Sequence, residues 1–156
     1  MRWSLAVLAV TLSVAGCGTG KRPFRIIQFC LADTGEFETM NSVLREVAAA
    51  NKLPFFDNST ATEAELHSAA DLQDKLKVAH PTVNVGTVGP TAMGFSVGNF
   101  ADAPSQMVVG FSKANDPVAA RKLSDDVVKA LSNKWRIREV PNVETSGAYP
   151  LKDCDG

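Results

Sequence analysis

Three short apolar segments, VNVGTV (83–88), TAMGFSV (91–97) and QMVVGFS (106–112), decide the fold of this 156-residue chain. In each segment the hydrophobic residues recur with a period of about two, which is typical of half-buried β-strands. Gly89-Pro90 separates the first two segments, and the stretch from Gly98 to Pro104 separates the last two. These turn residues predict an antiparallel meander of three consecutive strands.

Two main helices are predicted, one before the meander and one after it. The first begins at Asp33-Thr34, with Glu36 completing a capping pattern, and its apolar residues recur at helical spacing to about Asn51. The second begins at Asn115-Asp116-Pro117, because Asp is a preferred N-cap and Pro fits the first helical position. Apolar residues at helical spacing continue this second helix through Lys134.

Shorter elements complete the expected order. Phe24 to Ala32 is apolar on both faces and predicts a central strand, whereas Leu53 to Asp57 predicts an edge strand because it contains Pro54. A further helix is expected from a capping box at Thr62 and Glu65 to just before His80, and a last strand from Trp135 to Val140.

The resulting order, β-α-β-(α)-β-β-β-α-β, predicts an α+β fold. We expect a two-layer sandwich with an antiparallel or mixed sheet and two main helices. This order resembles an elaborated ferredoxin-like fold, a scaffold that implies no function by itself.

The amino-acid composition limits which classes of protein this chain can belong to. The chain is 45% hydrophobic and has 16 Lys and Arg against 17 Asp and Glu, so its net charge is −1. One domain suits this length, and a nucleic-acid binder acting through bulk electrostatics is excluded because there is no basic excess. Residues 1–16 hold 11 apolar residues and one charge, Arg2, so the remainder carries 15 − 17 = −2.

The N-terminus predicts export. Arg2 precedes an apolar stretch from Trp3 to Ala15 that is shorter than the roughly 17–25 residues of a spanning helix, as expected of a signal peptide over residues 1–16. Val14-Ala15-Gly16-Cys17 resembles the lipobox of bacterial lipoproteins. The resemblance implies that Cys17 is acylated and becomes the mature N-terminus, which anchors the chain in a lipid bilayer. Gly18, in place of Asp, favours the outer membrane by the sorting rule of enteric lipoproteins.

The lipid anchor implies a short tether over residues 17–23 and a single domain over residues 24–156. Gly18 to Pro23 spans at most ~20 Å, so the domain is expected close to the membrane. Lys21, Arg22 and Arg25 lie on or beside this tether and could contact anionic headgroups, although a solvated cluster without a function is an equal alternative.

With Cys17 assigned to lipid, Cys30 and Cys154 remain. In an exported protein, two leftover thiols predict one disulfide, here closing a long loop and holding the C-terminal tail to the first strand. A buried free Cys30 with an unpaired Cys154 is the alternative.

Catalytic and metal motifs are weak. Gly94-Phe95-Ser96-Val97-Gly98 matches the G-x-S-x-G pattern of α/β-hydrolases, but no long helix can follow it and both His67 and His80 precede Ser96. The two histidines lack the spacing of metal ligands. We therefore assign no catalytic residue, no metal and no cofactor.

Aromatic residues beside polar ones are candidates for contact with a protein partner. These candidates are Phe55, Phe56, Asn58, Asn99, Phe100 and Asp102. We expect an outer-membrane lipoprotein that faces the periplasm and binds a protein, with no catalytic role. In general form it resembles immunity proteins, which neutralise secreted bacterial effectors, or accessory subunits of envelope assemblies. The alternatives are a binder of a small ligand or envelope polymer, and a hydrolase that depends on Ser96.

Overall fold

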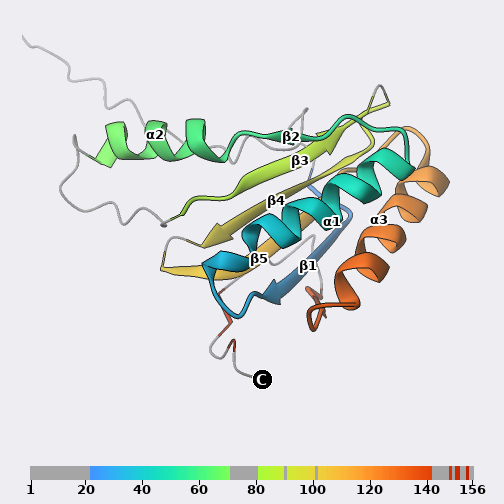
Figure 1. Ribbon diagram of the computed structural model, residues 1–156. Helices are drawn as coiled ribbons and strands as arrows, with labels where there is room; N and C mark the ends of the chain where they lie inside the picture. Colours follow the sequence, from blue (N-terminus) through green and yellow to red (C-terminus); the bar gives the residue numbers. More distant parts are fainter. Residues whose placement is uncertain are drawn as a thin grey trace, which may run out of the picture.

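Figure 1 shows the computed structural model of the chain, which describes residues 22–70, 81–89, 91–100, 102–141, 148, 150–151 and 154. Several sequence-based predictions lie outside these residues. They are the signal peptide over residues 1–16, the lipidation site Cys17, the tether up to Lys21, and the second half of the helix expected to end before His80.

One six-stranded sheet organises the molecule, in the order β2-β3-β4-β5-β1-β6, and every neighbouring pair is antiparallel. The predicted α+β class is therefore confirmed, with an antiparallel sheet. The strands are β1 (Arg25–Cys30), β2 (Phe56–Asp57), β3 (Asn84–Val88), β4 (Gly94–Phe100), β5 (Ala103–Phe111) and β6 (Arg138–Glu139).

Helices α1 (Phe37–Ala50) and α3 (Pro117–Ser132) lie side by side across one face of the sheet (Figure 1). A short 3-10 turn, η1 (Thr34–Glu36), precedes α1. A third helix, α2 (Ser59–Ala70), lies beyond β3 at the edge of the sheet. The described residues thus contain three α-helices, where the sequence indicated two main ones and one further helix.

Strand β1 is interior, as predicted from its apolar residues, because it pairs with β5 on one side and β6 on the other. Its residues alternate between the two faces of the sheet. Ile27 and Phe29 join the core under the helices, and Ile26 and Gln28 are buried on the opposite face. The same core contains the largest fully buried side chains, which include Phe95, Phe111, Met40, Leu44, Met107, Leu123 and Leu131.

The predicted meander is confirmed, but two of its boundaries are wrong. Strand β4 begins at Gly94 because the preceding residues form the reversal: the Gly89 N–H donates to Met93 O over 2.7 Å, and Ala92 adopts a left-handed φ of 57°. Most of the turn expected from Gly98 to Pro104 is strand. Phe100 pairs with Ala103 after an irregularity at Asn99 and Phe100, so the reversal is tight.

The predicted start of α3 agrees with the structure, whereas the predicted start of α2 does not. The Asp116 cap of α3 is confirmed, since its Oδ1 accepts from the Val118 and Ala119 N–H groups, each over 3.0 Å. The capping box at Thr62 and Glu65 is wrong, because α2 already begins at Ser59, whose N–H donates to Asp57 Oδ1 over 3.0 Å.

The last strand is shorter than predicted. Only Arg138 and Glu139 pair with β1, whereas Trp135 is buried with its ring centroid 5.6 Å from that of Phe29. The Trp135 indole donates to Glu36 Oε2 over 2.9 Å, and the Ala32 N–H donates to the same oxygen over 2.8 Å. Both bonds favour the carboxylate, with the indole contributing most, and they hold the pKa of Glu36 below its ordinary value of 4.5.

The C-terminal tail is held to the face of the sheet opposite the helices. The Sγ atoms of Cys30 and Cys154 lie 2.16 Å apart and their Cα atoms 5.4 Å apart, which fits the predicted disulfide. Opposite Cys30 on β5, the Gln106 amide makes two hydrogen bonds with the Leu151 backbone, of 2.8 and 2.6 Å. The tail is thus attached at two adjacent points.

Glu36→Gln is expected to lower the free energy of unfolding near neutral pH, and this loss should shrink as the pH falls below about 4.5. The folded-state pKa of Glu36 is lowered, so its stabilising contribution is present above about pH 4.5 and is lost as the pH falls through the folded-state value. Urea unfolding monitored by Trp135 fluorescence measures this. Glu38→Gln, an exposed carboxylate of α1, is the control; an equal pH dependence of both differences would contradict the assignment.

Candidate partner-binding surface

The six residues expected to contact a partner lie on both sides of β3, and four of them flank its start. Asn58 lies on one side of the start of β3, where its N–H donates to Asn84 O over 2.8 Å. Asn99 lies on the other side, where its Oδ1 accepts a hydrogen bond from the Val83 N–H over 2.9 Å. The structure therefore brings Asn58 to the same end of the sheet as Asn99, Phe100 and Asp102, with β3 between them. Phe55 and Phe56 do not lie at this end, because Phe56 pairs with Gly86 in the middle of the sheet.

On the β2 side, the two aromatic residues are half-buried. The Arg45 guanidinium lies 5.3 Å from the centroid of the Phe55 ring, which packs against the hydrophobic core. Phe56 lies over Gly86, where an added Cβ would come within 3.0 Å of the Phe56 Cζ. Asn58 is exposed. This side thus presents aromatic edges beside an exposed amide.

On the hairpin side, Asn99 has a structural role. Its Nδ2 donates to Pro81 O over 2.8 Å and to Pro104 O over 3.1 Å, in addition to the bond from Val83. Its amide therefore holds the start of β3 against the β4–β5 hairpin. Phe100 is half-buried and Asp102 is exposed in the turn, so these two are accessible from solvent.

A polar network between the two groups was missed by the sequence analysis. The Asn84 N–H donates to Ser59 Oγ over 2.9 Å, and Asn84 Nδ2 donates to Thr62 Oγ1 over 2.7 Å. These bonds fix the first turn of α2 against β3. A polar residue at the end of a strand, Asn84, was the sequence feature that could have indicated this network. Its partners lie more than 20 residues away in the sequence, so local residue spacing does not identify them.

The surface as a whole is polar and mostly uncharged. We define the distal surface as the exposed or half-buried residues Asn58, Ser59, Asn84, Phe100 and Asp102. Amide and hydroxyl groups beside aromatic rings are the composition of surfaces that bind proteins through hydrogen bonds and aromatic contacts.

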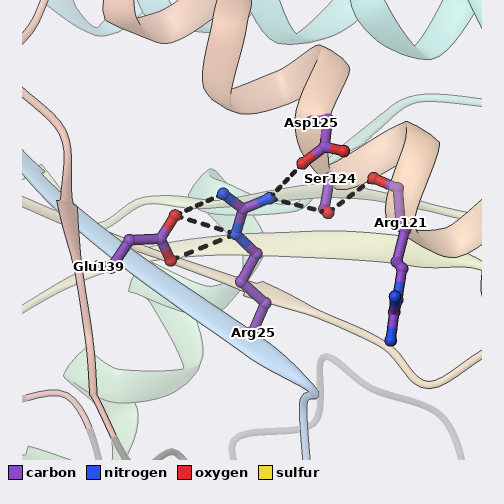
Figure 2. Close-up of polar contacts among 5 residues, drawn as sticks. All are labelled: Arg25, Arg121, Ser124, Asp125 and Glu139. Atoms are coloured by element: carbon purple, nitrogen blue, oxygen red, sulfur yellow. Dashed lines mark hydrogen bonds and ion pairs between the residues drawn. The ribbon is translucent and has the colours of Figure 1, made fainter.

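Arg25 does not belong to a free basic cluster at the tether; that sequence-based interpretation is wrong. Figure 2 shows its guanidinium between Glu139 of β6 and the Ser124–Asp125 pair of α3. It donates to Asp125 Oδ1 over 2.8 Å, to Ser124 Oγ over 3.0 Å, and to both Glu139 oxygens through Nε over 3.1 and 3.2 Å. The Glu139 bond is the main cause that raises the pKa of Arg25.

Ser96 does not occupy a nucleophile elbow. It is the third residue of β4 and pairs with Gly86 on β3 and Gly110 on β5, in the middle of the sheet. An elbow requires a sharp turn between a strand and a helix. His67 lies on α2, with its Nε2 3.7 Å from Glu63 Oε1, and His80 lies outside the described residues.

Within the described part of the chain, no group of three His, Cys, Asp or Glu side chains could hold a metal ion. In the same residues, no helix is both long and apolar enough to cross a bilayer. No protein family model and no curated protein matches the chain. The distal surface is therefore interpreted from its own chemistry.

Arg25→Met is expected to lower the free energy of unfolding by about 1–2 kcal/mol, because Glu139 and Asp125 would lose a shared cation on a side chain that is only 23% exposed. Arg121→Met is the control, since only the backbone oxygen of Arg121 takes part in the cluster and its side chain points away (Figure 2). Chemical denaturation measures both. Equal losses in the two variants would contradict the role given to Arg25.

Proposed function

We propose that the chain is an outer-membrane-anchored lipoprotein that faces the periplasm and binds another protein through the distal surface. The preferred partner is a secreted bacterial effector, which the domain would neutralise as an immunity protein. An accessory role in an envelope assembly would use the same surface.

One observation carries this proposal: four of the six candidate contact residues gather at the end of the sheet opposite the point where the N-terminal segment joins it, namely Asn58, Asn99, Phe100 and Asp102. Phe24 donates its N–H to Phe111 O at the end of β5, whereas Phe100 and Asp102 lie at the β4–β5 hairpin. A chain anchored through Cys17 would therefore hold these residues away from the bilayer, where a periplasmic protein can reach them.

The fold is compatible with a binding role. The neighbouring strands β6-β1-β5-β4, with α1 following β1 and α3 following β5, support an elaborated ferredoxin-like arrangement to which β2, α2 and β3 are added. In that interpretation the addition supplies half of the distal surface. The mid-strand position of Ser96 gives the hydrolase alternative no support.

Anchoring predicts that Cys17 carries lipid. Protein purified from the envelope of a Gram-negative host should begin at Cys17 and have an added acyl mass on that residue, because the lipobox thiol is the acceptor. Intact mass spectrometry and palmitate labelling measure this. Cys17→Ser should abolish labelling and release the protein from the membrane fraction; an unmodified Cys17 in the wild-type protein would contradict the proposed anchor.

Binding predicts that charge placed on the distal surface weakens association. Asn58→Arg combined with Asp102→Arg should raise the Kd of a partner captured from envelope extracts by roughly 30-fold or more, as expected when contacts at the centre of an interface are lost. Titration calorimetry on the captured partner measures this.

A matched control separates position from charge. Glu46→Arg combined with Asn115→Arg adds the same net charge at exposed positions near the end of α1 and before α3, at the opposite end of the domain. Its Kd should stay within about threefold of wild type, since changes outside an interface usually cost little. Equal weakening in both double variants would reject the distal surface as the binding site.

A further inference from the structure

The N-terminal segment joins the domain at one identifiable end of the sheet. Phe24 N–H donates to Phe111 O over 3.0 Å, and Pro23 lies 3.7 Å from the position of a Cβ on Gly110. Antiparallel pairing places the end of β3 and the start of β4 at this same end. In Figure 1 the β3–β4 turn, the end of α1 and the start of α3 gather there, at the upper right.

Contacts between loops join this end into one surface. The Asn115 N–H, just before α3, donates to Thr91 O in the β3–β4 turn over 3.3 Å. Leu53, just after α1, packs against Gly89, where an added Cβ would lie 2.7 Å from the Leu53 Cδ2. The segments after β3, before α3 and after α1 are therefore neighbours.

This surface is the positive end of the domain, and we call it the basic pole. It carries two acidic residues, Asp116 and Asp126, the second of which ion-pairs with Lys122, against five exposed basic residues, a difference of +3. Counting also Arg25 and its partners Asp125 and Glu139 gives six basic against four acidic residues, a net charge of +2, whereas residues 17–156 together carry −2. The five basic residues are Arg22, Lys52, Lys113, Arg121 and Lys122.

Exposed hydrophobic side chains gather at the same place. Val118, in the first turn of α3, is 78% exposed, and Val88, at the end of β3, is 45% exposed. Among the described residues these are the large hydrophobic side chains that are exposed. Aliphatic residues among basic ones are typical of surfaces that contact the interface of a bilayer.

We propose that the basic pole docks on the anionic phospholipid surface of the membrane, with Val118 and Val88 entering the headgroup region. The orientation rests on the proposed anchor at Cys17, because the six residues from Gly18 to Pro23 span at most ~20 Å and so keep this end near the bilayer. Electrostatic attraction over a Debye length of about 8 Å then favours contact. The distal surface faces away from the membrane.

The test uses unlipidated protein, produced from residue 17 onward with Cys17→Ser, so that the basic pole alone provides affinity. This form keeps every described residue. Cosedimentation is measured with vesicles of phosphatidylcholine alone and of phosphatidylcholine with phosphatidylglycerol, at low and high salt. Wild-type protein should bind the anionic vesicles preferentially, and binding should weaken as salt rises.

The decisive comparison uses two triple variants with the same total charge. Lys52→Glu, Lys113→Glu and Arg121→Glu at the basic pole should lower the partition coefficient at least about tenfold, since each basic residue near an anionic surface contributes about fivefold. Lys129→Glu, Lys134→Glu and Arg136→Glu, elsewhere on exposed positions, should lower it much less. Val118→Ser should reduce the binding that persists at high salt.

Equal losses in the two triple variants, or no preference for anionic vesicles in the wild type, would overturn the proposal. Trp135 fluorescence in each variant reports folding, because this tryptophan is buried in the core. Failure here is distinguishable from failure of the proposed function, which is tested on Cys17 itself and on the distal surface. Neither of those measurements involves the substituted basic residues.

Discussion

The structure depends on strand β1, which has neighbours on both sides and buried residues on both faces. Each end of this strand is held by a different long-range interaction. At its start, Arg25 joins β6 and α3 through Glu139 and Asp125. At its end, Cys30 joins Cys154, 124 residues later. The strand therefore fixes the last helix, the last strand and the C-terminal tail relative to the sheet.

Because the sheet is antiparallel, this arrangement gives the domain two chemically different ends. The chain arrives at the end where β1 begins, and the basic pole with the exposed Val88 and Val118 lies there. The β4–β5 hairpin and the start of β3 lie at the other end, where Asn84 and Asn99 organise a polar surface. The proposed tether and partner-binding role would use this separation, since a surface that contacts lipid cannot also be free for a partner.

Local patterns predicted the parts of the fold that local physics determines. Asp116-Pro117 marked the start of α3 because capping needs only neighbouring N–H groups. Thr62 was misread as a cap because its hydroxyl binds Asn84, 22 residues away. Arg25 was misread as a tether residue because its carboxylates lie about a hundred residues later. The candidate contact residues could be named from the sequence. That Asn99 connects the β4–β5 hairpin to the start of β3 could not, because its partners are set by the pairing of the strands.

The central claim is that the two ends of the domain face opposite ways relative to the membrane. Fluorescence quenching by a lipid-borne nitroxide tests it on lipidated protein in anionic vesicles, with a probe on Asn115→Cys at the basic pole or on Asp102→Cys at the distal surface. Strong quenching is expected at position 115 and weak quenching at position 102. Equal quenching, or stronger quenching at position 102, would contradict it.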